Sequence, residues 1–233
     1  MKYSSLLVTS LLVAVCAGCG DDDPTPAAPA APTAPRSGLV AEYLFNGNAN
    51  DSEGSNHGTL VGGPTLRSDR FGRADRAYTL DGVDDHITTT NDSFRSGNNV
   101  SVSLWFRVPS TAAGLAFSLM CSDFATGTSG ANASIAISIP STDNAAGAFT
   151  TANEWHHLLG TYDGIDIRCY INGVLAETTN HPGNISDPDR PLTVGRFNTT
   201  YWAGDIDDVR IYNRVISDAG EISNLYHEGG YAQ

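Results

Sequence analysis

Lysine is almost missing from this chain of 233 residues: Lys2 is the only one, and every other basic side chain is arginine. Acidic residues outnumber basic ones, and the formal net charge is −13 at pH 7. A surface of this sign repels phosphate backbones and anionic lipid head groups. The composition therefore argues against nucleic acid as a partner, and against membrane binding through a basic surface.

Residues for metal binding and nucleophilic catalysis are also scarce. Cysteine occurs four times and histidine six times, and no Cys-x-x-Cys pair remains once the N-terminal signal described below is removed. His156 and His157 are adjacent, so on a strand they point to opposite faces and cannot chelate one metal ion together. No Gly-x-Ser-x-Gly segment is present to form a nucleophile elbow. Zinc chemistry and serine hydrolysis therefore find little support.

The first 18 residues are typical of an export signal. Lys2 precedes an apolar run over 6–15, and small residues follow it. That run is too short to span a bilayer. Gly18 is followed by Cys19, a junction that resembles the lipobox of bacterial lipoproteins, in which the cysteine is lipidated. We therefore expect 1–18 to be a lipoprotein signal peptide and Cys19 to carry the lipid, with a secreted soluble protein as the alternative.

Residues 19–37 are acidic at first and then rich in Pro, Ala and Thr. Such a segment has too few apolar side chains to fold and favours extended polyproline conformations. It predicts a tether to a domain over 38–230, which is long enough for one all-β domain. The expected location is the bacterial outer membrane or cell surface, with the periplasm or secretion as alternatives. Contact with the membrane is expected only through the N-terminal lipid.

Short strand-like runs recur from residue 39 onward, separated by Gly, Asn, Asp and Pro clusters. This spacing, without intervening helical periods, predicts an all-β sandwich or jelly roll. The dipeptides at 163–164 (Asp-Gly) and 172–173 (Asn-Gly) predict tight hairpin turns. One short helix is expected near the C-terminus, where Asp218 and Glu221 form a capping box.

Six motifs follow one another along the domain. In chain order they are LVAEYLFN at 39–46, FG and YTLDGVDD within 71–85, VSLWF at 102–106, WHH at 155–157, YINGV at 170–174 and GDIDDVRIYNR at 204–214. Together they resemble the LamG-like jelly-roll domains of bacterial surface proteins, in the concanavalin A-like lectin/glucanase superfamily. The resemblance covers roughly 38–230, and it implies a two-sheet antiparallel jelly-roll β-sandwich with one short C-terminal helix.

The acidic stretch at 205–208 is the first candidate site. Asp205 and Asp207 are two residues apart, so on a strand they share a face, as the paired carboxylates of glycosidases do. The related glucanases, however, carry a Glu-x-Asp-x-x-Glu strand, and no such motif occurs in this sequence. We therefore expect a non-catalytic domain, with a glycan-cleaving enzyme as a less favoured alternative.

Calcium binding is a second interpretation of the same carboxylates. The loop 46–56 is rich in side-chain oxygens, and Ca²⁺ takes about six to eight oxygen ligands. The first and last strands of a jelly roll commonly lie together, so the loop and the acidic stretch could converge. LamG-like domains often hold a structural calcium, and by resemblance Asp51, Asn56 and Asp207 are the candidate ligands. The alternative is that these are turn residues and a solvated strand face.

The two cysteines after the lipid acceptor alternate with apolar neighbours, so Cys121 and Cys169 are both expected to point inward. Export to an oxidising compartment predicts a disulfide between them. Two buried free thiols, packed as small apolar side chains, are the alternative.

Sugar binding usually needs an exposed aromatic ring on which a sugar can stack. Core positions are expected for Trp105, Trp155 and Trp202. The aromatic candidates left for a ligand are Phe124, Phe197 and Tyr201, and none of them identifies one. The predicted function is non-catalytic recognition of a glycan or a surface protein, and the alternative is a structural or adhesive envelope module without a defined small ligand.

Overall fold

A computed structural model of the chain describes residues 30–90, 97–111, 116–121, 124–139, 141–185 and 191–231, with the backbone alone at 116–121, 138–139 and 141–142. The fold is mostly β, all paired strands run antiparallel, and a short α-helix lies near the C-terminus, as the sequence predicts. Among these residues no helix is both long and apolar enough to cross a membrane.

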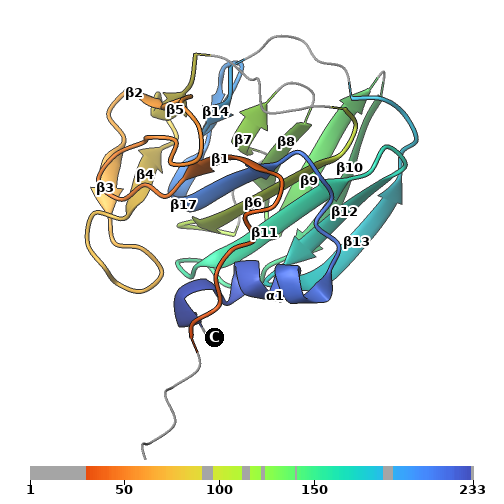
Figure 1. Ribbon diagram of the computed structural model, residues 1–233. Helices are drawn as coiled ribbons and strands as arrows, with labels where there is room; N and C mark the ends of the chain where they lie inside the picture. Colours follow the sequence, from red (N-terminus) through yellow and green to blue (C-terminus); the bar gives the residue numbers. More distant parts are fainter. Residues whose placement is uncertain are drawn as a thin grey trace, which may run out of the picture. The chain divides into compact units, whose positions relative to one another are not determined.

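Two sheets form the two layers of the sandwich (Figure 1). The front sheet has the order β13-β12-β11-β6-β17-β4-β3, with β1 also paired to β17, and the back sheet has the order β10-β9-β8-β7-β14-β5-β2. Strands β15 and β16 pair as a separate small hairpin. The bounds are β1 Leu39–Tyr43, β2 Thr59–Val61, β3 Thr65–Arg67, β4 Ala77–Asp81, β5 His86–Thr88, β6 Val100–Arg107, β7 Ala116–Cys121, β8 Phe124–Ser129, β9 Asn132–Ile139, β10 Ser141–Ala148, β11 His156–Tyr162, β12 Asp166–Ile171, β13 Val174–Asn180, β14 Thr193–Val194, β15 Arg196–Phe197, β16 Thr200–Tyr201 and β17 Ala203–Tyr212.

The core between the sheets follows from the two-residue period of the strands. On β6, alternate residues are apolar and fully buried in the core, and Ile135 and Ile137 of β9 belong to the same buried cluster. Burying one such aliphatic or aromatic side chain contributes roughly 1.5–3 kcal/mol. The intervening residues of β6 point to the outer face of the front sheet, where one of them, Arg107, lines the candidate site described below.

Strand β17 departs from this alternation. Ile206, Val209 and Ile211 are all buried in the core, although the first two are three residues apart. A β-bulge accounts for this three-residue spacing. Asp208 takes a left-handed φ of 46°, and the strand has one extra residue opposite β6 at this point. The bulge keeps the three apolar side chains inward and turns the polar residues between them outward.

The local signals for turns and for the helix are confirmed. Asn172 and Gly173 have φ of 51° and 77° in the turn between β12 and β13, as a tight hairpin requires. Helix α1, Ala219–Tyr226, begins after Asp218, whose carboxylate accepts the main-chain N–H of Glu221 at 3.0 Å. A single 3₁₀ turn, Glu228–Gly230, follows it.

Helix α1 covers part of the outer face of the front sheet. Its Ile222 and Leu225 are buried against side chains of β1, β11, β12 and β17. Ala34, which precedes β1, is buried in the same cluster, and the carbonyl of Pro32 accepts the N–H of Gly229. The compact unit begins at Ala31. The end of the segment expected to be a tether is therefore packed on the domain, and we call residues 31–38 the N-terminal strap.

The predicted disulfide is not found. Cys169 is a buried free thiol, and its Sγ lies 3.7 Å from the carbonyl oxygen of Ala133 on β9. Strand β7, which carries Cys121, is separated from β9 by β8. The side chain of Cys121 lies outside the described residues. Burial raises the pKa of the Cys169 thiol to about 12, which keeps it protonated and unreactive near neutral pH.

Candidate functional site

Outward-facing residues of β17 and its neighbours form rows across the front sheet, because cross-strand partners lie on the same face. In the first row Asp205 stands opposite Thr79 of β4 on one side and Arg107 of β6 on the other. Arg67, from β3 at the edge of the sheet, reaches the same carboxylate. Four strands from three separate parts of the sequence therefore supply the side chains around Asp205.

Asp205 orders this row. Its Oδ1 accepts a hydrogen bond from the hydroxyl of Thr79, and its Oδ2 accepts one from Nε of Arg107 at 2.6 Å. Nε of Arg67 lies 3.8 Å from the same Oδ2. The guanidinium of Arg107 also lies over the ring of Trp155, 5.0 Å from the centroid. The carboxylate thus fixes the guanidinium of Arg107 on the sheet and lies near that of Arg67.

These residues line a cavity of about 330 Å³ at the start of β17, which we call the Asp205 pocket. Its volume lies at the lower end of the range for ligand pockets, roughly 300–1,000 Å³. The wall is completed by Leu80, Asp81, Pro109, Asn153, Ala203 and Gly204. Glycine is required at 204, because a Cβ there would lie 2.6 Å from the carbonyl oxygen of Arg107 and from the ring of Trp202.

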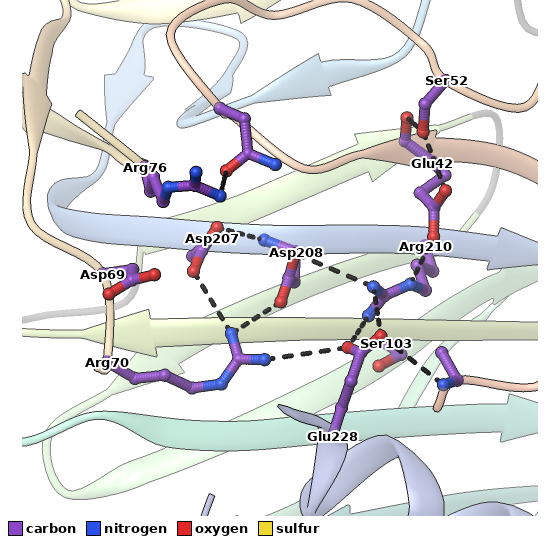
Figure 2. A network of polar contacts seen from close by, with 12 residues as sticks. Glu42, Ser52, Asp69, Arg70, Arg76, Ser103, Asp207, Asp208, Arg210 and Glu228 are labelled. Atoms are coloured by element: carbon purple, nitrogen blue, oxygen red, sulfur yellow. Dashed lines mark hydrogen bonds and ion pairs between the residues drawn. The ribbon is translucent and has the colours of Figure 1, made fainter. Parts of the chain in front are cut away.

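Beyond this pocket, a buried ion network closes the part of the face around Asp207, Asp208 and Arg210 of β17 (Figure 2). Arg70, from the loop between β3 and β4, donates from Nη1 to Asp208 at 2.6 Å and to Asp207 at 3.2 Å. Its guanidinium lies over the rings of Phe71 and Trp105, at 4.7 and 4.6 Å from their centroids. Only 2% of the Arg70 side chain is exposed. This arginine therefore fastens its loop onto the sheet.

Arg210 holds the other half of the network. Its Nε donates to Oε1 of Glu42 at 2.8 Å, and its Nη1 lies 2.9 Å from Oε2 of Glu228. Glu42 also accepts two bonds from Arg36 of the strap, at 2.8 and 2.9 Å. The Arg210 side chain is 2% exposed. Figure 2 shows these groups converging from β1, β17 and the C-terminal turn, so the network joins both ends of the domain.

Burial and mutual charge shift the pKa values inside the network. Burial, together with the negative charge of Asp208, raises the pKa of Asp207 well above its ordinary value. Burial likewise raises the pKa of Glu228. Burial opposes ionisation of Glu42, but hydrogen bonds from its two arginines outweigh that effect and lower its pKa. Burial, with two nearby arginines, lowers the pKa of His157 to about 3.

A smaller cavity of about 200 Å³ lies over the network. Its volume is below the usual range for ligand pockets. Its acidic and basic groups are already paired with one another, Arg73 with Asp69 at 2.7 Å among them. The network is therefore best explained by its structural role, and the Asp205 pocket remains the stronger candidate site.

The three predicted calcium ligands are divided between two places. Asp51 and Asn56 lie in the loop after β1, where the Asp51 carboxylate accepts four main-chain N–H groups at 3.0–3.3 Å. Asp207 lies on β17 and is paired with Arg70 at 3.2 Å. Protein donors thus already occupy the carboxylates of Asp51 and Asp207, and the three residues do not fit one shared site. Calcium binding elsewhere in the chain stays a prediction.

Another acidic cluster lies in the turn between β4 and β5. Carboxylate oxygens of Asp81, Asp84 and Asp85 lie within 4.8 Å of one another. Oδ1 of Asp81 accepts the main-chain N–H groups of Val83, Asp84 and Asp85, at 2.8, 3.3 and 3.4 Å. These bonds fold the turn, which accounts for the cluster without a bound ion.

The predictions for the aromatic residues are partly confirmed. The three tryptophans are buried, as expected. Phe124 is wrong as a ligand-binding candidate: it begins β8 and its side chain is fully buried in the core. Phe197 and Tyr201 are half-buried on the β15–β16 hairpin, where the ring of Tyr201 lies 5.6 Å from the guanidinium of Arg196. Neither is among the described residues that line the Asp205 pocket.

Within that pocket the sequence points only to Asp205, through the acidic stretch. Arg107 has a local signal: it shares the strand parity of Ser101 and Ser103, which alternate with apolar residues, so it is expected to face outward. The roles of Thr79 and Arg67 had no local signal, because they depend on which strands flank β17.

Comparisons with known proteins agree with this fold. Residues 81–222 match the Laminin_G_3 family, described as the concanavalin A-like lectin/glucanases superfamily. A similar solved structure is domain 4 of AbnA, a GH43 extracellular arabinanase from Geobacillus stearothermophilus, in complex with arabinotriose. It is 21% identical with a TM-score of 0.65, and the alignment covers 80% of this chain and 97% of that domain.

Two toxin domains are also similar. The receptor binding domain of botulinum neurotoxin C/D mosaic serotype is 15% identical, with a TM-score of 0.67 over 82% of this chain and 51% of that one. For the binding domain of Paraclostridial Mosquitocidal Protein 1 the values are 17%, 0.67, 82% and 52%. This chain therefore spans about half of each toxin domain. No curated protein matches. Because the family match covers more than half of the sequence, the chain belongs to the concanavalin A-like lectin/glucanases superfamily.

Proposed function

We propose that this protein is a non-catalytic carbohydrate-recognition module and that the Asp205 pocket is its binding site. The observation that carries the proposal is the polar row of Thr79, Asp205 and Arg107, which opens into a cavity of about 330 Å³. Guanidinium and hydroxyl groups held on strands offer the directed polar contacts that a hydroxyl-rich ligand needs. Pro109 and Ala203, which are both exposed, add apolar surface for the C–H face of a sugar ring.

The relatives support a binding role. One domain of similar fold was solved in complex with arabinotriose, and others are receptor binding domains. At these identities the likeness extends to the fold alone, so the ligand must follow from the residues of this pocket.

The pocket itself argues against hydrolysis. Glycosidases generally use two carboxyl groups, one of which donates a proton to the leaving group. Both oxygens of Asp205 are engaged, by Thr79 and Arg107. Oδ1 of Asp81, the other acid of the pocket, accepts main-chain N–H groups of its own turn. This arrangement supports recognition without cleavage.

A glycan array with the full chain tests the proposal. We expect wild type to retain at least one class of glycan and Arg107→Ala to lose it. Arg168→Ala is a matched control, because Arg168 is 26% exposed, compared with 22% for Arg107, and is likewise paired with carboxylates of the front sheet. If wild type bound no glycan, the structural or adhesive alternative would be favoured. Release of reducing sugar from a polysaccharide would contradict the non-catalytic role.

Location is the second part of the proposal. A signal peptide over 1–18 and a lipid on Cys19 would attach the domain to the bacterial envelope. The strap packs on the domain from Ala31 onward, so the tether would run from the lipid to residue 30. We expect Cys19→Ser to move the protein from the membrane fraction to the soluble fraction. Wild type that already fractionates as soluble would contradict the lipid anchor.

A further inference from the structure

The Asp205 pocket contains more unused hydrogen-bond donors than acceptors. Within the described part of the chain, Arg107 donates through Nε to Asp205, and no hydrogen bond engages its two Nη nitrogens. Arg67 makes only its 3.8 Å approach to Asp205, and 58% of its side chain is exposed. The terminal N–H groups of both guanidinium groups are therefore available to a ligand.

The acidic oxygens of the pocket are largely occupied, in contrast. Asp205 accepts from Thr79 and Arg107, and one oxygen of Asp81 accepts three main-chain N–H groups. The carboxylate of Asp205 is thus paired with Arg107 and lies near Arg67. A ligand in this pocket meets the free ends of planar guanidinium groups, whose geometry matches a carboxylate in a paired, two-bond contact.

Arg107 is also pre-oriented. Its Nε is fixed by Asp205 at 2.6 Å, and its Cζ lies over the ring of Trp155, 5.0 Å from the centroid. A guanidinium held at both its inner nitrogen and its face loses little side-chain freedom when a ligand binds. An arginine on an open surface, without these two contacts, would lose more side-chain freedom on binding.

We propose that the Asp205 pocket selects an acidic sugar, in which the ring carboxylate of a uronate unit binds the free ends of Arg107 and Arg67. The exposed apolar side chains of Pro109 and Ala203 face the C–H groups of the ring, and Asn153 is available to its hydroxyls. The cavity of about 330 Å³ suits a compact ligand of this kind. The inference rests on the proposed function, since it names the class of glycan bound at the same site.

Because the chain is acidic overall, selection of an acidic sugar must depend on short-range contacts. With a formal net charge of −13, the protein repels a polyanion at long range. Attraction of a uronate must then come from the two arginines at short range. Binding should depend steeply on them, whereas arginines elsewhere on the sheet should not matter.

Calorimetric titration of the full chain with tri-galacturonate, with its methyl ester and with neutral arabinotriose tests the inference. We expect the free acid to bind about 10- to 100-fold more tightly than the ester, as charge-assisted hydrogen bonds allow. Arg107→Ala should lose this preference. Arg107→Lys keeps the charge without the planar fork and should lose most of it, and Arg168→Ala should keep it. Melting curves of all variants check that each one is folded.

The outcomes separate the inference from the function on which it rests. If the ester or arabinotriose binds as tightly as the acid, and Arg107→Ala weakens that binding, the acidic-sugar inference is overturned and carbohydrate recognition stands. If no sugar binds at all, both fail. If a poly-glutamate peptide binds more tightly than tri-galacturonate, the carboxylate belongs to an acidic protein partner and the inference is overturned in its favour.

Discussion

The outer face of the front sheet uses the same two residue types, aspartate and arginine, in two opposite ways. At the start of β17 the guanidinium groups of Arg107 and Arg67 are 22% and 58% exposed and border an open cavity. Over the middle of the strand, Arg210 of β17 and Arg70 of the loop between β3 and β4 are each 2% exposed and paired with carboxylates. Burial, more than residue identity, distinguishes the proposed recognition site from the structural network.

The difference has a simple origin in the chain's connections. The loop between β3 and β4 and the C-terminal segment both return over the middle of the front sheet, where they deliver Arg70 and Glu228. Charges removed from water there must be paired, because an unpaired buried charge is costly. The Asp205 end is left open, so its charges can remain only partly paired.

Arg210→Ala should give the largest effect, at the buried end. It leaves Glu42 and Glu228 without their central cation, and removing one partner of a buried pair costs about 3–5 kcal/mol of unfolding free energy. Urea unfolding monitored by tryptophan fluorescence measures the loss. Arg210→Met, which keeps the volume, is the companion variant. A loss below about 1 kcal/mol for Arg210→Ala would mean that the network behaves like an exposed one.

His157 should make the buried end sensitive to acid. Its pKa is about 3 in the folded protein, because burial disfavours the charged ring, and about 6.5 in the unfolded chain. The unfolded state therefore takes up a proton that the folded state does not as the pH falls from 6.5 towards 3. Stability that is present above pH 6.5 should decrease by about 1.4 kcal/mol per pH unit in that window.

His157→Gln isolates this contribution. The amide cannot be protonated, and it can still hydrogen-bond to Ser103, the partner of His157 at 2.8 Å. Unfolding free energies measured from pH 7 to pH 4.5 should fall less steeply for the variant than for wild type. Equal slopes would show that His157 is not neutral and buried in solution.

Arg107→Ala should have a small effect on folding and a large one on binding. Its ion pair is partly exposed, and exposed pairs contribute about 0–1 kcal/mol to stability. A melting temperature close to that of wild type, with loss of the array signal, is the expected combination. Strong destabilisation by this variant would show that Asp205 and Arg107 have a structural role, as the buried network does. The two ends of the face would then not differ in function.

Calcium should have the smallest effect. The carboxylates of two of the predicted ligands, Asp51 and Asp207, are already engaged by N–H groups and by Arg70. Adding Ca²⁺, or removing it with a chelator, should therefore leave the melting temperature unchanged. A rise on addition of Ca²⁺ would show that the protein binds the ion in its folded state, at these residues or at others.

Much of the fold could be predicted because its signals are local. The Asn172-Gly173 turn, the cap at Asp218 and the alternation on β6 each depend on residues within a few positions of one another. The strap was missed for a physical reason. Its Pro/Ala composition has little apolar surface of its own, and Ala34 is buried only because α1 and the sheet supply the rest.

The candidate site was harder to predict because its parts are distant in the sequence. Asp205 is 126 positions from Thr79 and 98 from Arg107. From the sequence, Asp207 and Asp205 are equivalent carboxylates on one face of a strand. In the structure Arg70, 137 positions away from Asp207, donates a hydrogen bond to it. Strand parity predicts which face a residue takes, and only the strand order determines which partners it meets there.

The most direct test of this account is the dissociation constant of Arg107→Ala for the glycan that wild type binds best, measured beside Arg210→Met. The account predicts that Arg107→Ala loses at least tenfold in affinity with little change in melting temperature. It predicts that Arg210→Met, which alters only the buried network, keeps the affinity of wild type wherever it remains folded. Unchanged affinity in folded Arg107→Ala would contradict the assignment of the Asp205 pocket as the recognition site.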